Sequence, residues 1–414
     1  MGDERLIYHV DVNSAYLSWS SVDRLARGES DLRLVPAVVG GDVAKRHGVV
    51  LAKSGLAKVY GIHTGEPLSD ALRKCPNLIS IPPDFRIYQH LSSEFKAICK
   101  TYATAVQDFS IDECFLDVTE TTAYHHPVET AWELKERIKA ELGFTVNVGV
   151  GPNKLLAKMA GDFEKPDKVH TLWLDEIREK MWPLPVRRLL SVGQKTADKL
   201  NLYGIRTIGD LAHCKCDHLK QVLGNKQGEH LYRYANGWDD SPVLDEPQEE
   251  KGYSVSITLP QDVKTKTAAR QVIKKLVDFV ARRLRRKHRL AKRVSVQIRS
   301  SSFVDRSHQR TLDRATDITR EIETTAFQLF DELWDGETPI RLIGVALTQI
   351  ENGNISQISM FDTRTLERER HIDQALDAIR KRFGTDAVSR GIADKNLPSV
   401  GKKYEARFEM DRDK

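Results

Sequence analysis

Residues 105–118 read AVQDFSIDECFLDV, and this stretch decides the fold. Two apolar runs flank a polar tip at 110–113, a pattern typical of two β-strands joined by a turn. Outward from it, RLIYHVDV at 5–12 and TVNVGV at 145–150 also predict strands, and a helical pattern covers about 128–142. Strands that alternate with helices in this way predict an α/β or α+β sheet domain.

Carboxylates fall at the ends of these predicted strands. Asp11 ends the first strand, and Asp112 and Glu113 occupy the polar tip. A sheet that pairs the strands brings three carboxylates to one edge, and hard divalent ions such as Mg²⁺ prefer such oxygen ligands. Two ions held there can activate a hydroxyl and stabilise a departing pyrophosphate. A strand-end acid and an ordinary polar turn fit the same spacing, so both interpretations stay open at this point.

Lysines follow the strand at 145–150. The segment GPNKLLAKMAGDFEKP places Lys154, Lys158 and Lys165 along and just beyond a short helix. A helix N-terminus with nearby lysines suits a triphosphate. An amphipathic helix whose lysines are merely solvated has the same spacing.

The charge of the chain is unevenly distributed. Its net charge is only +5, but residues 251–310 hold 17 Lys and Arg against three acids, which leaves the rest of the chain acidic. A basic region in an otherwise mildly acidic protein is typical of nucleic-acid binding. A membrane surface or a solvated helix is the alternative.

Length and composition exclude several classes of protein. The chain of 414 residues is long enough for two or three domains, and it has no uncharged apolar stretch of about 18 residues. Its start lacks a signal-peptide pattern, and its five cysteines are scattered without a CxxC pair. We therefore expect a cytoplasmic protein with reduced thiols and no membrane association. The sequence does not give the oligomeric state, for which a monomer is the simple expectation.

Two further regions follow the first sheet domain. Short helical patterns punctuated by glycines cover 184–212, and the acidic, proline-containing segment 237–252 reads as a tether. Beyond it the predicted order is strand, helix, strand, strand, helix, strand, which is that of a split βαβ sandwich.

Together these motifs resemble one family. Asp11 with Tyr16 five residues later, S-I-D-E at 110–113, G-V-G-P-N-K at 149–154, L-A-K at 156–158 and K-P at 165–166 are similar to a Y-family DNA polymerase of the bacterial polymerase IV (DinB) branch. The resemblance implies an α+β multidomain fold, a right-hand polymerase with a ferredoxin-like palm, small fingers, a helix-hairpin-helix thumb and a split βαβ little finger. The implied boundaries are 1–20 and 78–172 for the palm, 21–77 for the fingers, 173–240 for the thumb, 241–252 for a linker, 253–350 for the little finger and 351–414 for a C-terminal tail.

The resemblance implies a translesion DNA polymerase that adds dNMPs to a primer 3′ end with two Mg²⁺ ions, at low fidelity and without proofreading. Primer–template DNA and dNTPs would be its substrates. Asp11, Asp112 and Glu113 would be the catalytic metal ligands, completed by the Val12 carbonyl. Tyr16 would be the steric gate that rejects a 2′-hydroxyl. The implied nucleotide-binding residues are Ser14, Ala15, Tyr16, Ser54, Lys58 and Lys165.

Three positions depart from the family pattern. Lys58 stands where the family usually has an arginine, Gly55 replaces a tyrosine, and Ala15 replaces an aromatic residue. Lysine offers a point charge where arginine offers a bidentate fork, so nucleotide affinity and selectivity are the properties these changes affect.

Contacts with DNA and with a clamp are also implied. The turn S-V-G-Q-K-T at 191–196 is similar to a helix-hairpin-helix whose amides hold a DNA phosphate. The expected DNA-binding residues are Ser191, Val192, Gly193, Lys195, Thr196, Arg285, Arg286, Lys292, Arg293 and Arg299. The peptide QISMF resembles the segment by which bacterial polymerases dock on the sliding β clamp, through Gln357, Ile358, Met360 and Phe361.

Two rival functions remain at this stage. One is a non-catalytic DNA- and clamp-binding scaffold that lost turnover through the changes at Gly55 and Lys58. The other is a nucleotidyl cyclase, which uses paired carboxylates on a similar palm, although a cyclase has no need of a thumb or a basic domain.

Overall fold

The computed structural model describes residues 5–41, 48–245, 249–353, 363–384 and 387–388. Contacts between residues divide the chain into two compact units, Met1–Gly41 with Gly48–Pro247 and Asp42–His47 with Gln248–Lys414. Within the described residues, no helix is both long enough and apolar enough to cross a membrane.

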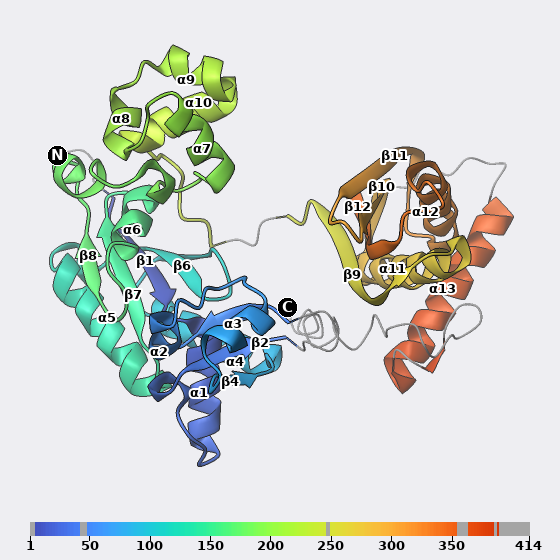
Figure 1. The fold of residues 1–414 in the computed structure, drawn as a ribbon, viewed down its shortest axis with the longest axis horizontal. Coiled ribbons are helices and arrows are strands. Elements are labelled where there is room, and N and C mark those ends of the chain that lie inside the picture. The colour runs from blue at the N-terminus through green and yellow to red at the C-terminus, as the bar shows by residue number, and fades with distance from the viewer. Residues whose placement is uncertain (1–4, 42–47, 246–248, 354–362, 385–386, 389–414) are drawn as a thin grey trace. The chain divides into compact units, whose positions relative to one another are not determined.

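A five-stranded sheet forms the centre of the first unit (Figure 1). Its strands lie in the order β5, β6, β1, β7, β8, and every neighbouring pair is antiparallel except β7 and β8. The bounds are β1 Ile7–Val12, β5 Ala105–Asp108, β6 Glu113–Asp117, β7 Val146–Gly151 and β8 Val169–Thr171. The predicted strands at 5–12 and 145–150 and the two strands around the polar tip therefore pair in one sheet.

The two faces of this sheet are covered differently. Tyr8, Val10 and Val12 alternate along β1 and join the core with α1, Ala15–Ala26, α4, Phe85–Lys100, and α5, Pro127–Leu142. The opposite face is covered by α6, Lys154–Gly161. Gly149 permits this close packing, because a Cβ there would lie 1.9 Å from the Ala157 carbonyl oxygen.

A smaller sheet and a helical region complete the first unit. The sheet has the order β3, β2, β4, formed by Val50–Lys53, Ala37–Gly40 and Ile79–Ile81, with α2, Gly55–Val59, and α3, Leu68–Lys74. The helical region contains α7, Gln194–Leu202, α8, Ile208–His213, α9, Cys216–Leu223, and α10, Asn225–Ala235. Thr207 and Asp210 form a capping box that starts α8.

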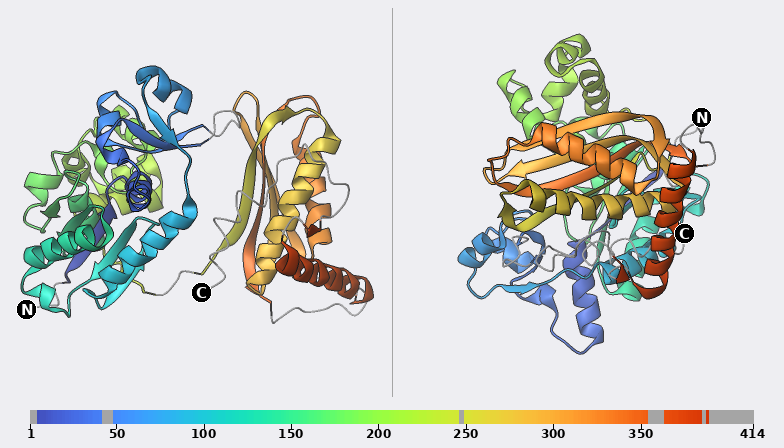
Figure 2. Two further views of the ribbon diagram at one scale, coloured as in Figure 1. Left: turned by 90° about the horizontal axis from the view of Figure 1, so that it is seen from below. Right: turned by 90° about the vertical axis from the view of Figure 1, so that its right-hand side faces the viewer.

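The second unit is built on a four-stranded antiparallel sheet in the order β11, β10, β12, β9. The element order β9, Gly252–Val263, α11, Lys266–Arg286, β10, Arg289–Ser300, β11, Asp305–Thr316, α12, Thr319–Leu333, and β12, Ile340–Asn352, matches the predicted split βαβ order. Figure 2 shows α11 and α12 side by side on one face of the sheet. Val294, Val296 and Ile298 of β10 are buried in the same core as both helices, which leaves the other face of the sheet open to polar residues.

A last helix, α13, Thr363–Phe383, packs against this unit through charged residues (Figure 2). Arg285 of α11 lies 3.4 Å from Asp373 and 2.7 Å from Asp377, and Arg380 lies 2.8 Å from Asp278 of α11. Asp373 also accepts a hydrogen bond of 2.9 Å from the backbone N–H of Thr319, the first residue of α12. The helix after the predicted clamp peptide is therefore part of this unit.

Candidate active site

The predicted carboxylates meet at one end of the five-stranded sheet. Asp11 and Glu113 are direct cross-strand partners in β1 and β6, and the Val12 N–H donates to the Asp112 carbonyl oxygen at 3.0 Å. Cross-strand partners place their side chains on the same face of a sheet. The sheet pairing on which the metal prediction depended is therefore present.

The turn that carries Asp112 is fixed from two sides. The Ser110 hydroxyl donates to the Asp112 carboxylate at 2.6 Å, and the Asp112 N–H donates to the same hydroxyl at 3.2 Å. From α4, Lys96 donates to the Ser110 carbonyl at 2.8 Å, and Ser92 donates to the Ile111 carbonyl. These contacts with α4 hold the polar tip in place against the sheet.

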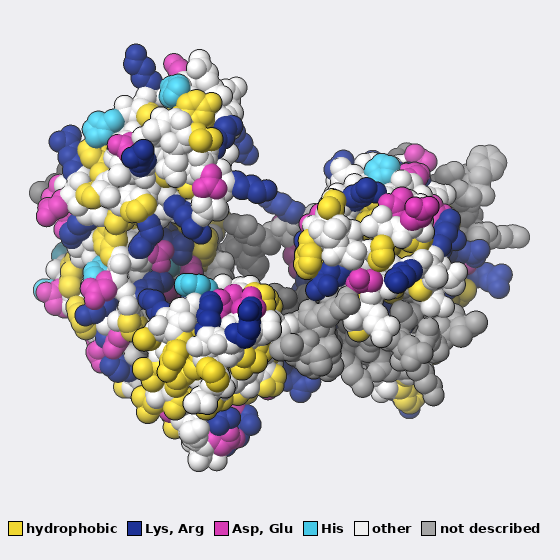
Figure 3. Space-filling view, viewed as in Figure 1, with side chains coloured by type: hydrophobic (Ala, Val, Ile, Leu, Met, Phe, Trp, Pro, Cys, Tyr) yellow, Lys and Arg dark blue, Asp and Glu magenta, His cyan; other side chains and the backbone are white. Residues whose placement is uncertain are grey.

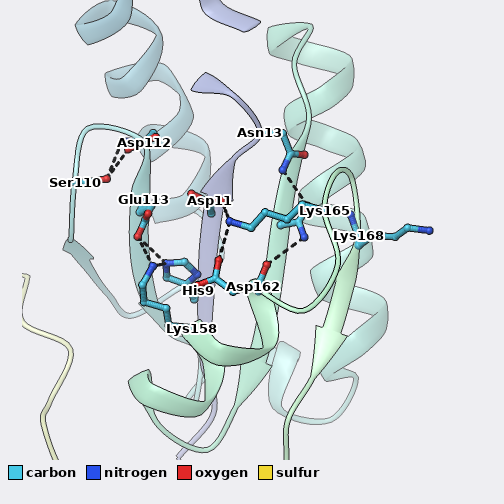
Figure 4. Close-up of polar contacts among 12 residues, drawn as sticks. His9, Asp11, Asn13, Ser110, Asp112, Glu113, Lys158, Asp162, Lys165 and Lys168 are labelled. Carbon is cyan, nitrogen blue, oxygen red and sulfur yellow. Dashed lines mark hydrogen bonds and ion pairs between the residues drawn. The ribbon is translucent and has the colours of Figure 1, made fainter. Parts of the chain in front are cut away.

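Lysines pair with the two other carboxylates. Figure 4 shows Lys165 reaching Asp11, while Lys158 and His9 both point at Glu113. Lys165 also contacts Asp162 at 2.8 Å, and Lys158 contacts Glu113 at 2.7 Å. Among the described residues, no three His, Cys, Asp or Glu side chains converge into a cluster that could hold a metal, so these carboxylates do not form a ready-made cation cage.

The environment shifts the protonation of both acids. Burial raises the pKa of Asp11 to about 6, although Lys165 acts in the opposite direction. Burial alone also raises the pKa of Glu113, but hydrogen bonds from His9 and Lys158 outweigh it and lower that pKa to about 2. Three carboxylates and a neighbouring backbone carbonyl are hard oxygen donors, which is the donor chemistry that suits Mg²⁺.

A pocket of about 450 Å³ lies between the carboxylate edge and the three-stranded sheet. It brings together most of the residues predicted for metal and nucleotide binding, namely Asp11, Val12, Ser14, Ala15, Tyr16, Ser54, Lys58, Asp112 and Lys165. Glu113 does not line it. The pocket also contains residues that were not predicted from the sequence, namely Asn13, Leu51, Ala52, Lys53, Thr64 and Pro166.

Tyr16 lines this pocket and packs against other aromatic side chains. Its ring stacks on Tyr88 with centroids 4.7 Å apart and meets Phe85 edge-on at 5.9 Å. Trp19 and Tyr88 are fully buried beneath it. This packing limits the movement of the Tyr16 ring, as a residue that excludes substrates by shape requires.

Two predicted phosphate-binding lysines lie elsewhere. Lys154 binds the Gln107 side chain and the Pro242 carbonyl, both at 3.0 Å, and Lys158 pairs with Glu113. Neither lines the pocket. The sequence spacing placed all three lysines on one segment, but α6 directs only the loop after it, with Lys165, toward the pocket.

The Ser54 hydroxyl forms hydrogen bonds with three backbone groups. Its buried hydroxyl donates to the Val35 carbonyl at 2.7 Å and accepts N–H groups from Ala37 at 3.1 Å and Ala57 at 3.0 Å. A hydroxyl has one donor and two acceptor sites, so it has none left for a nucleotide. Ser54 therefore caps α2 and lines the pocket, and its binding of a nucleotide stays a prediction.

Asn13 was missed by the sequence reasoning although it organises the site. Its side chain donates to Asn147 at 3.0 Å and accepts hydrogen bonds from Thr145 and from the Asp167 N–H, both at 2.9 Å. It thus connects the end of β1 to the loop that carries Lys165. An asparagine after a strand has no distinctive pattern in a sequence, so only the tertiary structure shows this role.

The predicted DNA-binding residues fall in different surroundings. Ser191 has a left-handed φ of 73° and is followed by Val192, which is buried. Gly193 is the N-cap of α7, and Lys195 in that helix is exposed. On the face that Figure 3 shows, Lys and Arg side chains are interspersed with acidic and hydrophobic ones in both units.

In the second unit, Arg293 and Arg299 directly precede and follow the run Val294–Ile298 of β10, and they alternate with its buried valines and isoleucine onto the open face of the sheet. Arg285 differs from them, because its guanidinium is buried against Asp373 and Asp377. The prediction that Arg285 contacts DNA does not fit this placement. The predicted clamp residues at 357, 358, 360 and 361 lie outside the described residues.

Family models match three parts of the chain. Residues 10–162 match the impB/mucB/samB family, residues 250–360 match the C-terminal domain of that family, and residues 187–239 match the DNA polymerase-iota thumb domain. Among solved structures, a Y-family DNA polymerase chimera superposes with a TM-score of 0.74 at 24% identity, covering 84% of this chain and 99% of its own. The fold and the site thus define a Y-family DNA polymerase, and the predicted fold class is confirmed.

Curated relatives give the branch. The chain is 45% identical to DNA polymerase IV of Clostridium acetobutylicum over 94% of its length and 98% of the relative, and 34% identical to DNA polymerase IV 1 of Bacillus subtilis over 97% and 96%. The chain belongs to the DNA polymerase IV family of bacteria, which are translesion DNA polymerases. The predictions of family and of enzyme class are therefore confirmed, and the scaffold and cyclase alternatives are not supported.

Proposed function

We propose that this chain extends a DNA primer by two-metal nucleotidyl transfer at the pocket between the carboxylate edge and the three-stranded sheet. The observation that carries the proposal is the register of β1 and β6, which sets Asp11 opposite Glu113 with Asp112 beside them. Two Mg²⁺ ions bound there would lower the pKa of the primer hydroxyl and stabilise the departing pyrophosphate. Asp11, Asp112, Glu113 and the Val12 carbonyl would hold them.

The surrounding residues position the substrate. Lys165 and Lys58 line the pocket and would bind the triphosphate, and the N–H groups at Ser14, Ala15 and Tyr16 lie where α1 begins. Lys165 pairs with Asp11 in this structure, and a triphosphate would compete for that ammonium group. Tyr16, stacked on Tyr88, would exclude a 2′-hydroxyl by contact.

The domain assignment is part of the same proposal. The palm would be 1–20 and 78–172, the fingers 21–77, the thumb 173–240, the linker 241–252, the little finger 253–350 and the tail 351–414. The small three-stranded sheet of the fingers supports an open site with low fidelity and bypass of damaged template bases.

DNA would be held through its backbone. The turn at Ser191–Gly193, with Lys195 and Thr196 following it, would bind one phosphate, and the open sheet face with Arg293 and Arg299 would follow the duplex. Arg286 and Lys292 at the adjoining helix end and strand stay within this proposal, and Arg285 does not. For the clamp, the sequence QISMF is the support.

The test is primer extension with Mg²⁺ and four dNTPs on one undamaged template. The double variant Asp112→Ala, Glu113→Ala should lose extension while it keeps wild-type affinity for primer–template DNA. A matched control, Glu94→Ala with Glu120→Ala, removes two exposed acids that do not line the pocket and should extend like the wild type. Extension that survives in the first variant would refute the ligand assignment.

A further inference from the structure

His9 lies directly beneath the carboxylate edge. It shares a face of β1 with Asp11, and its cross-strand partner in β6 is Phe115, two residues after Glu113. The side chain is fully buried, with its ring 4.9 Å from that of Phe115. On the other side α6 approaches so closely that a Cβ on Gly161 would lie 3.0 Å from His9 Nδ1.

Both polar contacts of the ring are made by Nε2, which lies 3.4 Å from Lys158 Nζ and closer to the Glu113 carboxylate. Nε2 donates to that carboxylate when it carries the ring proton. Nε2 lies 3.2 Å from Glu113 Oε2, whereas Nδ1 is buried without a partner within the part of the chain that the structure describes. Lys158 Nζ reaches the same Glu113 oxygen at 2.7 Å (Figure 4). Glu113 Oε2 is therefore held by His9 and Lys158, and among the described residues no protein group forms a hydrogen bond with Oε1.

If its only role were to fill the core, a histidine at position 9 would lower the stability of the fold. An unpartnered buried nitrogen costs free energy, and a phenylalanine would fill the same site between Phe115 and Gly161 without that cost. We therefore attribute the advantage of a histidine over a phenylalanine here to Nε2, the ring nitrogen that contacts Glu113. That nitrogen meets a carboxylate to which the proposed function gives the role of metal ligand.

We propose that His9 is a positioning residue for the metal site: its Nε2–H, together with Lys158, holds one oxygen of Glu113 and keeps the other available for a divalent cation shared with Asp11. The inference rests on the proposed function, because Glu113 must be a metal ligand. Groups that orient metal ligands through a second hydrogen bond commonly change metal affinity by about 10- to 100-fold when they are removed.

Two amide variants separate positioning from packing. In His9→Gln the side-chain amide reaches the place of Nε2, whereas in His9→Asn it reaches only the place of Nδ1, which has no partner here. Both variants bury a similar polar amide in the same core. If His9 only fills the core, the two should behave alike, and if it positions Glu113, only Gln should substitute for it.

The measurement is Mn²⁺ binding by the full chain with primer–template DNA, followed by the loss of the electron paramagnetic resonance signal of free Mn²⁺. We expect His9→Phe and His9→Asn to bind Mn²⁺ roughly 10-fold more weakly than wild type, and His9→Gln to bind within about threefold of it. Thermal unfolding of each variant is recorded alongside. Equal affinities for the Gln and Asn variants, or a wild-type affinity in His9→Phe, would overturn the inference.

A Glu113→Gln variant distinguishes an error in the role of His9 from an error in the proposed metal site. If Glu113→Gln binds Mn²⁺ as the wild type does, Glu113 is no ligand and the metal assignment itself is wrong. If Glu113→Gln binds weakly while all His9 variants match the wild type, only the role of His9 is wrong. The Mg²⁺ concentration for half-maximal extension gives a second readout, which should rise for Asn and Phe and not for Gln.

Discussion

Asp11 and Glu113 face each other across β1 and β6, but their environments move their protonation in opposite directions. Burial raises the pKa of Asp11 to about 6, whereas hydrogen bonds from His9 and Lys158 overcome burial and lower the pKa of Glu113 to about 2. At neutral pH both are ionised, but only Asp11 is close to protonation. The two acids therefore respond differently when the pH falls.

This asymmetry predicts how metal binding depends on pH. Below about pH 6 a proton competes with Mg²⁺ for Asp11, so the Mg²⁺ concentration for half-maximal extension should rise by up to about tenfold per pH unit. Above pH 6 it should be flat, because Asp11 is already ionised. Single-turnover extension with Mg²⁺ titrated at pH 5 to 8 measures this, with DNA affinity followed at each pH. A requirement for Mg²⁺ that does not change between pH 5 and 7 would contradict the prediction.

The ion pairs between α11 and α13 predict a difference in stability. Arg285→Ala removes the buried guanidinium that pairs with Asp373 and Asp377, which should destabilise the second unit by about 3–5 kcal/mol. Arg320→Ala removes an exposed guanidinium of α12 that pairs with Glu369 of α13, and it should cost about 1 kcal/mol or less. Hydrogen exchange of α13 amides measures both. If the two variants exchange alike, the buried network does not hold α13 in place.

The sequence predicted the palm sheet well, because its strands carry short apolar runs with acids at defined ends. The register that sets Asp11 opposite Glu113 follows from burying Val10 and Cys114 on the same face, and periodicity along the chain indicates that face. The same local reading failed for Lys154 and Lys158. Their distance from the pocket depends on how α6 packs on Gly149 and Gly151 of β7, which spacing along the chain does not encode.

Arg285 shows a second limit of the sequence. Its neighbours form a basic run, and charge counted along the chain cannot distinguish an arginine that faces solvent from one that faces another helix. The carboxylates that pair with it lie about 90 residues later, in a helix for which the sequence suggested no function. Charge patterns thus predict that a region is basic, whereas tertiary contacts determine which of its charges are available to DNA.

This distinction predicts how DNA binding depends on salt. Arg293→Ala on the open sheet face and Lys195→Ala in the thumb should each reduce the slope of log affinity against log salt by about 0.9. Arg286→Ala, at the end of α11 and within the same proposed interface, should act likewise, whereas Arg73→Ala, an exposed arginine of α3 outside it, should leave the slope unchanged. Fluorescence anisotropy of labelled primer–template between 50 and 300 mM salt measures the slopes. An unchanged slope in both Arg293→Ala and Lys195→Ala would remove these residues from the DNA interface.

The position of Tyr16 in the pocket predicts that it selects dNTPs over rNTPs. Tyr16→Ala opens space above Tyr88 where a 2′-hydroxyl would fit, so the ratio of dNTP to rNTP incorporation should fall by at least about tenfold, or about 1.4 kcal/mol. Tyr16→Phe keeps the ring and should discriminate like the wild type. Single-nucleotide kinetics with matched dNTP and rNTP measure the ratio. If the ratio in Tyr16→Ala equals that of the wild type, another group excludes the ribose.

Substitutions at Gly55 and Lys58 are predicted to strengthen nucleotide binding. A Cβ on Gly55 would meet no heavy atom within 4 Å, and both residues line the pocket, so Gly55→Tyr with Lys58→Arg introduces the residues usual in the family without a clash at the backbone. The arginine fork can bind a phosphate through two hydrogen bonds where lysine offers a point charge. We expect the KM for dNTP to fall severalfold with little change in kcat, as steady-state kinetics on one template would show. Lys74→Arg, on α3 and paired with Glu66, changes a lysine that does not line the pocket and should leave KM unchanged. A KM that rises in the double variant would mean that Lys53 and Thr64, two further polar residues of the pocket lining, have adapted the pocket to lysine.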